Sequence, residues 1–526
     1  MEIKKLVSAL AACLGLAACG GGGGGSGTID PPAGGSNGWT PGVFLPSSSF
    51  KNQCANPRTG RDSNGQPFPD TQGSVLTENN WLRSWTNELY LWYDEVVDRN
   101  PANFATLDYF DLLKTTQTTA SGTPKDKPGF HFTRPTDEWE AFSQSGVSPG
   151  YGATFLILSG APPREVVVLL VEPGSPAAAQ GLLRGDEIIS VDGFSIDSSN
   201  TNALNAGLFP TNSNQSHMFG IRNSSGTRNV TMVSGQIAST PVHTVDVIPT
   251  ASGNVGYVLF NDHILPAEDG LFDAINTLKT ANVQDLVLDV RYNGGGSLAI
   301  ASELAYMIAG SAQTAGRTFE RLVWNKKHPT TNPVTGAPLA PMPFADKTIF
   351  GLSRPAGTPL PTLNLSRVYV LTSDSTCSAS ESIINSLRGV DVEVIQIGTT
   401  TCGKPFGFYD FDNCGTTYFS IQFQGVNQKD FGDYIDGFSP ANTPASDRGT
   451  PVPGCAVEDD LGHQLGDPNE RMLSVALAYR MSGTCALPPP TSMGQNKMTG
   501  PAEGIGKIVR APYREIRRVR PEDFTP

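Results

Sequence analysis

The stretch "DLVLDVRYNGGG", residues 285 to 296, decides the fold class. Its first part, Asp285 to Arg291, is predicted to be a continuous strand buried on both faces of a sheet. The strand ends at a glycine-rich turn, Asn293 to Gly296. A helix is predicted next, because apolar residues then recur at helical spacing, at Leu298, Ala301, Leu304 and Ile308.

The same strand–turn–helix unit recurs on both sides of this stretch. "NVGYVLF" precedes a helix face formed by Leu271, Ile275 and Leu278. After an insertion rich in Pro and Thr (residues 310–365), "RVYVLTS" and "VEVIQIG" are predicted as further strands. Successive units of this kind predict a mostly parallel sheet with helices on its faces. Sites in such sheets form at the carboxyl ends of the strands, where the glycine-rich turn lies.

A second candidate site segment, "TSDSTCSASESIINSLRG" (residues 372–389), follows the next strand and opens a helix. Free amides at a helix start can stabilise an oxyanion beside a serine nucleophile. Ser375 and Ser378 also suit helix capping, and taken alone a serine in this setting favours the cap.

A base for such a serine is present in "TTTCGKPFG" (residues 399–407), which carries Lys404. No histidine lies between His328 and His463, so a local Ser–His pair is absent from the sequence. A neutral lysine can activate a serine. Its neutral form costs roughly 4.6 kcal/mol at pH 7, and burial can shift a lysine pKa by about 3–5 units, which covers that cost.

Residues 150–197 have a different character, "EVVVLLVEPGSPAAAQGLLRGDEIISVDGFSI". A strand (Val166–Val171) leads through a proline–glycine turn into a short helix, and a second strand (Glu187–Val191) ends at the tight turn Asp192–Gly193. This pattern resembles a PDZ domain spanning about 145–246. The resemblance implies that the terminal carboxylate of a peptide binds at Tyr151, Gly152, Ala153 and Thr154, while the peptide adds as a strand. The alternative is a purely structural β-sandwich.

Four motifs in order, "PGSPAAAQGLLRGDEIISVDG", "LVLDVRYNGGG", "SASE" and "GTTTCGK", resemble the C-terminal processing (tail-specific) serine proteases over about residues 80–410. The resemblance implies a core similar to crotonase and ClpP, with Ser378 as nucleophile and Lys404 as general base. It also implies an oxyanion hole made of the Ala379 amide and a glycine of the turn, Gly294 first and Gly295 next.

One position departs from that family. Many members carry a Gln four residues after the catalytic Lys, and this chain has Phe408 there. Orientation of Lys404 is then expected from another group, such as Ser380 or a backbone carbonyl.

The N-terminus is predicted to be a targeting signal. Lys4 and Lys5 precede an apolar run, Leu6 to Ala18, that is too short to span a membrane as a helix. The run ends in "LAAC", which resembles the lipobox of bacterial lipoproteins, so Cys19 is expected to be lipidated. In that system the absence of Asp at position 20 favours the outer membrane. An ordinary secretory signal is the alternative.

Six cysteines remain after the signal, an even number that suggests disulfides in an oxidising compartment. Fifteen pairings are possible for six cysteines. Proximity in sequence favours Cys402–Cys414 and Cys455–Cys485, which leaves Cys54–Cys377. No C-x-x-C pair exists, and we expect neither a metal site nor a cofactor.

Altogether the chain of 526 residues is predicted to be a multidomain α+β protein. Its net charge of -13 argues against nucleic acid as a partner.

A helical segment is predicted after Thr77, the expected cap, because apolar residues follow at helical spacing: Trp81, Leu82, Trp85, Leu89 and Trp92. A second helix is expected around Leu107–Leu113. The basic tail is a candidate contact for lipid headgroups or a partner, or is disordered. The predicted parts are a signal peptide (1–18), a lipidated tether (19–74), a helical domain (75–143), the PDZ domain (145–246), a catalytic α/β domain (250–485) and a Pro-rich basic tail (486–526).

The predicted function is that of a lipid-anchored serine endopeptidase of the bacterial envelope, facing the periplasm and cutting proteins or peptides with free C-termini. One alternative is a non-catalytic PDZ-bearing lipoprotein scaffold with a decayed protease core. Another is a hydrolase in which His263 activates Ser378, with the neighbouring Asp262 as orienting group. Adjacent side chains on a strand point apart, which weighs against that last arrangement.

Overall fold

The computed structural model describes residues 39–62, 65–485, 507–509 and 517–518. The predicted signal and lipidation site therefore lie outside the described residues. The described residues from Phe44 onward belong to one compact unit, and only the short stretch 39–43 is described outside it. Within the described ranges no helix is both long and apolar enough to cross a membrane.

A six-stranded sheet forms the centre of the catalytic region, in the order β12-β13-β14-β18-β19-β26. All neighbours are parallel except β12 and β13. The mostly parallel sheet is as predicted, although the central strand ends at Asp289, two residues earlier than expected. The strands are β12 (Val242–Ile248), β13 (Val255–Phe260), β14 (Asp285–Asp289), β18 (Arg367–Thr372), β19 (Glu393–Gly398) and β26 (Gly454–Ala456).

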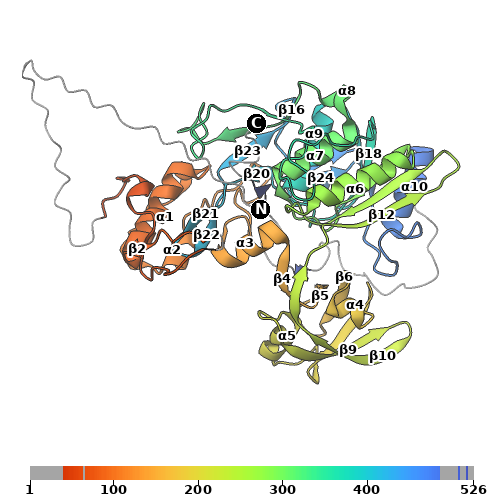
Figure 1. Ribbon diagram of the computed structural model, residues 1–526, viewed down its shortest axis with the longest axis horizontal. Coiled ribbons are helices and arrows are strands. Elements are labelled where there is room, and N and C mark those ends of the chain that lie inside the picture. Colours follow the sequence, from red (N-terminus) through yellow and green to blue (C-terminus); the bar gives the residue numbers. More distant parts are fainter. Residues whose placement is uncertain (1–38, 63–64, 486–506, 510–516, 519–526) are drawn as a thin grey trace, which may run out of the picture. The chain divides into compact units, whose positions relative to one another are not determined.

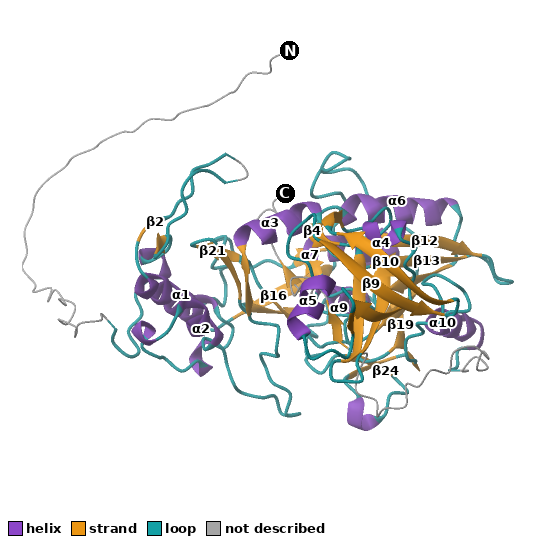
Figure 2. Ribbon diagram, turned by 90° about the horizontal axis from the view of Figure 1, so that it is seen from below, coloured by secondary structure: helices purple, strands orange, loops and turns teal. Residues whose placement is uncertain are grey.

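Apolar residues on both faces of this sheet explain its burial between helices. Figure 2 shows its orange strands between helix α6 and helix α10. On one face the core includes Leu286, Leu288 and Val370 packed with α6, α7 and α9, and on the other Val287 and Leu371 pack with α10. The helices are α6 (Ala267–Thr280), α7 (Leu298–Ala309), α8 (Ser311–Thr314), α9 (Ala379–Gly389) and α10 (Arg471–Ser482).

A second sheet builds the PDZ-like region in the order β10-β9-β7-β6-β5-β27, with β8 beside β7. Its turn at Asp192–Gly193 has positive φ at both residues (50° and 79°), as the Asp-Gly pair predicts. Helix α4 begins after the predicted turn with Ser175 as its cap. The elements are β4 (Val147–Gly150), β5 (Ala153–Ser159), β6 (Glu165–Val171), α4 (Pro176–Ala179), β7 (Glu187–Val191), β8 (Phe194–Ser195), α5 (Thr201–Leu208), β9 (Ser216–Asn223), β10 (Gly226–Val233), β11 (Gly235–Ala238) and β27 (Lys507–Val509).

The predicted helical segment packs on a hairpin from the far end of the chain. Trp81 and Trp85 of α1 share a core with Tyr418, and β3 pairs with β22, so the red and orange helices lie beside the blue hairpin in Figure 1. The cap of α1 is Ser74, not Thr77; Thr77 is the third helical residue and completes the capping box. The elements are α1 (Val75–Leu89), α2 (Thr106–Asp111), β3 (Phe132–Pro135), α3 (Thr136–Ser145), β21 (Phe411–Asn413) and β22 (Thr416–Phe419).

The remaining short elements complete the unit. A four-stranded sheet in the order β17-β16-β23-β20 takes two strands from the insertion (residues 310–365) and two from the segment after Lys404. The short strand β28 pairs with β15 immediately after the glycine-rich turn. These elements are β1 (Gln53–Cys54), β2 (Thr71–Gln72), β15 (Gly296–Ser297), β16 (Thr318–Trp324), β17 (Met342–Pro343), β20 (Phe406–Gly407), β23 (Phe423–Val426), β24 (Phe438–Pro440), β25 (Thr450–Val452), β28 (Arg517–Arg518) and the 3-10 turns Ser47–Ser49, Tyr93–Glu95, Pro101–Asn103 and Ala445–Asp447.

All six expected cysteines form disulfides, but only Cys455–Cys485 has the predicted partner. The other two bridges are Cys54–Cys414 and Cys377–Cys402, so pairing by sequence proximity was wrong for four cysteines. The reason is the parallel sheet: Cys377 and Cys402 follow the neighbouring strands β18 and β19, whose carboxyl ends lie at the same sheet edge.

Candidate active site

Hydrogen bonds distinguish the five serines between Ser373 and Ser382. The hydroxyl of Ser373 donates to the carbonyl of Arg291, and that of Ser380 donates to the carbonyl of Asn293 (3.0 Å). The Ser375 hydroxyl lies 3.5 Å from the Asp374 carboxylate, and the Ser382 hydroxyl donates to the carbonyl of Ser378. Of these five hydroxyls only that of Ser378, a fully buried residue, has no partner among the described residues. The sixth serine of the stretch, Ser386, is also buried and unpartnered, but it lies inside helix α9 and not at its start.

The backbone at Ser378 is held in an unusual conformation. It has φ 62° and ψ -115°, a region that residues with a Cβ rarely adopt. Ser378 occupies the N-cap position of helix α9, and Ala379 is the first residue of that helix. The strained turn therefore places a buried hydroxyl at the start of a helix, where unpaired amides and the positive end of the helix dipole lie.

The glycine-rich turn lies against this helix start. The Asn293 carbonyl accepts from the Ser380 hydroxyl and from the Cys377 amide (3.1 Å). The Gly295 amide donates to the Asn293 side chain (2.9 Å), whereas the Gly294 amide has no acceptor in the described part of the chain. Of the two predicted oxyanion glycines, Gly294 is thus the one with an uncommitted amide.

Lys404 is fully buried, and two aromatic rings flank its ammonium group. Its Nζ lies 4.5 Å from the ring centre of Phe130 and 5.3 Å from that of Phe408. Phe408 stands where many members of the resembled family carry Gln. It places an aromatic ring near the Lys404 ammonium, whereas a Gln would place a side-chain amide there. Ser380 is committed to the Asn293 carbonyl, so its hydroxyl does not take over the role of that Gln.

Glu381, which sequence reasoning did not assign to the site, joins the nucleophile and base segments. Its Oε2 accepts the backbone amides of Ser378 (2.9 Å) and Lys404 (2.8 Å). Its Oε1 accepts the Gly403 amide (2.9 Å) and the Thr401 hydroxyl (2.5 Å). Burial raises the pKa of this carboxyl, while the four hydrogen bonds act in the opposite direction. The available signal was the capping position of Glu in "SASE", three residues after Ser378.

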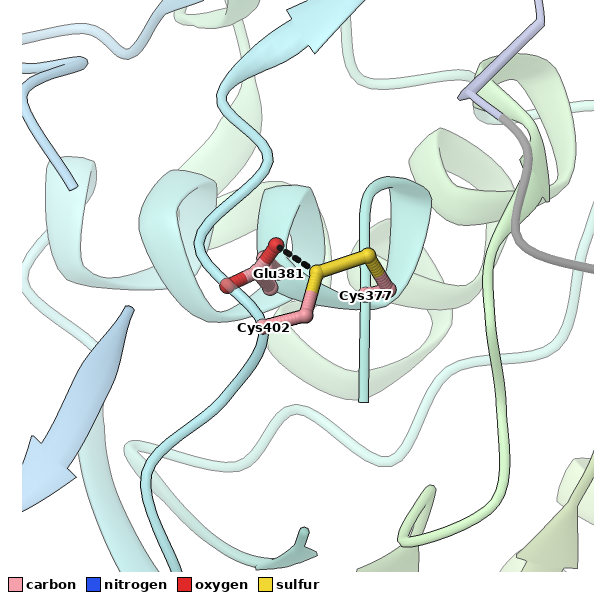
Figure 3. A group of neighbouring side chains, drawn as sticks. All are labelled: Cys377, Glu381 and Cys402. Carbon is pink, nitrogen blue, oxygen red and sulfur yellow. Dashed lines mark hydrogen bonds between the residues drawn. A yellow bond between two sulfur atoms is a disulfide. The ribbon is translucent and has the colours of Figure 1, made fainter. Parts of the chain in front are cut away.

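The Cys377–Cys402 disulfide joins the same two segments covalently. Cys377 directly precedes Ser378, and Cys402 lies two residues before Lys404. Figure 3 shows the bridge with the Glu381 carboxylate against it, at 3.5 Å from Cys402 Sγ. These three side chains have the proximity of metal ligands, but disulfide sulfurs offer no thiolate, so the group does not fit a metal ion.

His263 lies beside the glycine-rich turn. The alternative hypothesis, in which His263 activates Ser378, therefore placed this histidine near the site. Its Nδ1 donates to the Asn293 side-chain oxygen (3.0 Å), and its amide donates to the Gly295 carbonyl. Burial lowers the pKa of His263 to about 3. A group with so low a pKa is a weak base at neutral pH, and its contacts instead hold the turn in place. Asp262 accepts a hydrogen bond from Ser239 and is not bonded to the His263 ring.

A cavity of about 340 Å³ opens beside the disulfide. Its lining includes Phe130, which flanks Lys404, and Lys127, whose ammonium donates to the carbonyls of Cys402 and Ile435. Burial lowers the pKa of Lys127. This cavity adjoins the nucleophile segment and is large enough for a substrate side chain. The other lining residues are Pro124, Pro128, Asp374, Ser375, Cys377 and Cys402.

The predicted carboxylate-binding loop precedes strand β5 of the PDZ-like sheet. Gly152 has φ 77°, and a Cβ there would meet the Cβ of Ser175 at 2.2 Å, so this position requires glycine. Tyr151 is buried and donates through its hydroxyl to the carbonyl of Gly207 (3.0 Å). Ala153 and Thr154 begin strand β5.

A buried ionic network connects the PDZ-like region with the glycine-rich turn. Asp459 accepts from Arg184 of the PDZ-like region (2.8 Å) and from Arg291 (2.6 Å), two residues before Asn293. Arg291 also bonds Asp289 and Glu470. The two arginines hold the pKa of Asp459 well below its usual range, so this carboxyl is ionised.

The fold and this site define a PDZ-containing serine peptidase architecture. Residues 254–409 match the family model "Peptidase family S41", and residues 167–204 match the model "PDZ domain". Residues 254–409 are thus similar to S41 peptidases and residues 167–204 to PDZ domains, and the predicted resemblance to C-terminal processing proteases is confirmed.

Individual relatives agree with this assignment. The chain is 29% identical to carboxyl-terminal-processing peptidase 2 of Arabidopsis thaliana over 30% of its own length and 31% of the relative's. It is 26% identical to a carboxyl-terminal-processing protease of Picosynechococcus over 50% and 56%, so it matches about a third to a half of these relatives. A putative S41 protease from Bacteroides fragilis shares the fold with a TM-score of 0.56 at 24% identity, covering 77% of this chain and 97% of that one.

Proposed function

We propose that the protein is a serine endopeptidase in which Lys404 activates Ser378 and the amides of Gly294 and Ala379 stabilise the oxyanion. The observation that carries the proposal is the arrangement of both segments around Glu381. One carboxylate oxygen accepts the amides of the proposed nucleophile and of the proposed base.

The chemistry follows from burial and the uncommitted hydroxyl. Ser378 attacks a peptide carbonyl, its proton passes to neutral Lys404, and the developing oxyanion accepts from the two amides. The lysine later returns that proton to the leaving amine. Each oxyanion donor is typically worth about 2.7–4 kcal/mol of transition-state stabilisation.

The test is peptide cleavage by three purified single variants across pH. Ser378→Ala and Lys404→Ala should each abolish cleavage without unfolding the protein, and the double variant should be no worse, since both residues act as one unit. His263→Ala should retain the pH profile of the wild type. A fully active Lys404→Ala, or a folded but inactive His263→Ala with a changed pH limb, would contradict the Ser–Lys assignment.

The non-catalytic scaffold is distinguished by active-site labelling. A fluorophosphonate should modify the wild type at Ser378 and leave Ser378→Ala unmodified. Absence of labelling in a protein that still binds peptides would favour the scaffold.

The PDZ groove is proposed to select substrates by their free C-termini, supported by the glycine-requiring loop at Gly152 in front of strand β5. Cleavage of a peptide with an amidated C-terminus should then be slower than cleavage of the free acid. Ala153→Glu should remove that difference, because a second negative charge repels the carboxylate. Equal rates for both peptides with the wild type would contradict C-terminal selection.

The envelope location rests on the lipobox-like "LAAC". Cys19→Ser should move the chain from the membrane pellet to the soluble periplasmic fraction. A variant that still sediments with membranes would exclude the lipid anchor.

A further inference from the structure

The edge of the PDZ-like sheet carries a strand from the C-terminal tail of the same chain. Strand β27 pairs antiparallel with β5, with Lys507 opposite Ile157 and Val509 opposite Phe155. Without β27, β5 would be the outermost strand of the sheet. The tail therefore occupies the edge at which a peptide ligand would add, and it runs toward the loop at Gly152.

A second piece of the tail lies at the catalytic site. Strand β28, Arg517–Arg518, pairs parallel with Gly296–Ser297, immediately after the proposed oxyanion glycines. It also contacts β20, Phe406–Gly407, two residues after Lys404. One tail thus supplies a strand to both places where an extended substrate would bind.

The charge of the tail fits this position. Six of the residues from 507 to 520 are basic and one is acidic, whereas the whole chain has a net charge of -13. A basic segment is attracted to an acidic protein, and its attachment raises its local concentration at the sites. Within β27, Ile508 and Val509 favour an extended conformation.

We propose that the tail is a built-in ligand of this chain, which occupies the edge of the PDZ-like sheet through residues 507–509 and the backbone of Gly296–Ser297 through residues 517–518, and which competes with external peptides. The competition at Gly296–Ser297 rests on the proposed peptidase function; occupation of the PDZ edge does not. At an effective concentration of about 1 mM and an intrinsic dissociation constant of about 0.1 mM, a tethered segment weakens an external ligand about tenfold.

The first experiment measures binding without catalysis. A fluorescent peptide with the sequence of residues 505–518 is titrated by anisotropy into Ser378→Ala protein in three forms: full length, lacking residues 507–526, and lacking residues 519–526. The form without 507–526 should bind about tenfold more tightly than full length, and the control truncation should behave as full length. Equal affinity in the first two forms would overturn the proposal.

The second experiment tests the register and the source of the tail. The pair Ile157→Cys and Lys507→Cys should cross-link under mild oxidation within one chain, faster than the control pair Ile157→Cys and Val509→Cys, because only the first pair is directly opposed. Cross-linked dimers would assign the strand to a second copy, and the absence of a cross-link would remove it from this edge; either result refutes the proposal.

The third measurement is peptide hydrolysis by the same truncations with Ser378 intact. Removal of residues 507–526 should raise kcat/KM severalfold, and the tail peptide added in trans should reverse the gain. A truncated enzyme of unchanged or lower kcat/KM would refute the inhibitory role. If all forms lack activity, the proposed peptidase function fails, and the binding and cross-linking results still decide whether the tail occupies the PDZ edge.

Discussion

Glu381→Gln is the sharpest test of how the site is assembled. The carboxylate has two oxygens, and each accepts two hydrogen bonds from the base and nucleophile segments. A carboxamide has one acceptor oxygen and one NH2 group that only donates. Whichever way the substituted side chain is turned, two donors lose their acceptor and face another donor.

The magnitude follows from that count. A hydrogen bond to a charged group contributes about 1.5–3 kcal/mol, so two lost bonds amount to about 3–6 kcal/mol. Removing a buried charge offsets part of this, since burial raises the pKa of Glu381 and so disfavours its ionised form. We therefore expect a net loss near the lower end, about 3 kcal/mol, concentrated in the segments that carry Ser378 and Lys404. A displacement of about 1 Å in either segment can lower the rate about 100-fold.

The assay combines thermal unfolding with hydrolysis of an internally quenched peptide. The matched control is Glu268→Gln, also a buried carboxyl, whose Oε1 alone accepts two backbone amides, from Ile349 and Phe350. Its Oε2 has no partner in the described part of the chain, so the carboxamide of the control variant can keep both bonds through its oxygen. Glu381→Gln should lose kcat/KM far more than the control. Wild-type activity and melting temperature in Glu381→Gln would refute the reasoning.

Three further predictions concern the surroundings of the site. Burial raises the pKa of Asp126 to about 6 from 3.8, so its contribution to stability is complete below pH 3.8 and is lost as the pH rises through about 6. The free energy of unfolding of the wild type, relative to Asp126→Asn, should thus fall by about 3 kcal/mol between about pH 3 and pH 7 in urea titrations; a constant difference would contradict this. Asp459→Asn leaves two buried arginines without one of their counter-charges and should lower the free energy of unfolding in denaturant by about 3–5 kcal/mol. Loss of an exposed ion pair costs under about 1 kcal/mol, so an effect that small would refute the role of Asp459. Replacing both Cys377 and Cys402 by Ser opens a bridge over 25 residues, worth about 3–4 kcal/mol, and should lower kcat as well as the melting temperature. The Cys455–Cys485 bridge, which spans 30 residues, is the control. Its removal should lower the melting temperature by a similar amount and leave kcat unchanged. Equal losses of kcat in the two variants would contradict a role of the Cys377–Cys402 bridge in the site.

Local patterns in the sequence were sufficient for the elements and their class. The unbroken apolar run before "NGGG" predicts a strand buried on both faces, and the structure places β14 in the middle of the sheet. Glu187–Val191 was predicted with the bounds that β7 has, because a glycine-containing turn stands at each end. These signals depend on a few neighbouring residues, and turn chemistry and periodicity act over that distance.

The sequence also indicated the candidate chemistry, through the order of four motifs, and the family model matches the region that contains three of them. Without the family resemblance, it did not separate a nucleophile from a helix cap among the serines of residues 372–389, since Ser375 and Ser378 both suit helix capping. The separation came from hydrogen bonds to residues about 80 positions away, such as those that occupy Ser373 and Ser380.

Only the tertiary structure decided which distant groups meet. Glu381 accepts amides from a loop about 20 residues later because β18 and β19 are parallel neighbours, and that same adjacency pairs Cys377 with Cys402. The hairpin of β21 and β22, whose turn contains Cys414, lies against α1, so this cysteine pairs with Cys54 across 360 residues. The partners of strands β27 and β28 likewise depend on free sheet edges, and an edge exists only after the other strands have found their order. Sequence spacing fixes periodicity along one element, whereas contacts between elements depend on the closure of long loops, which no local pattern records.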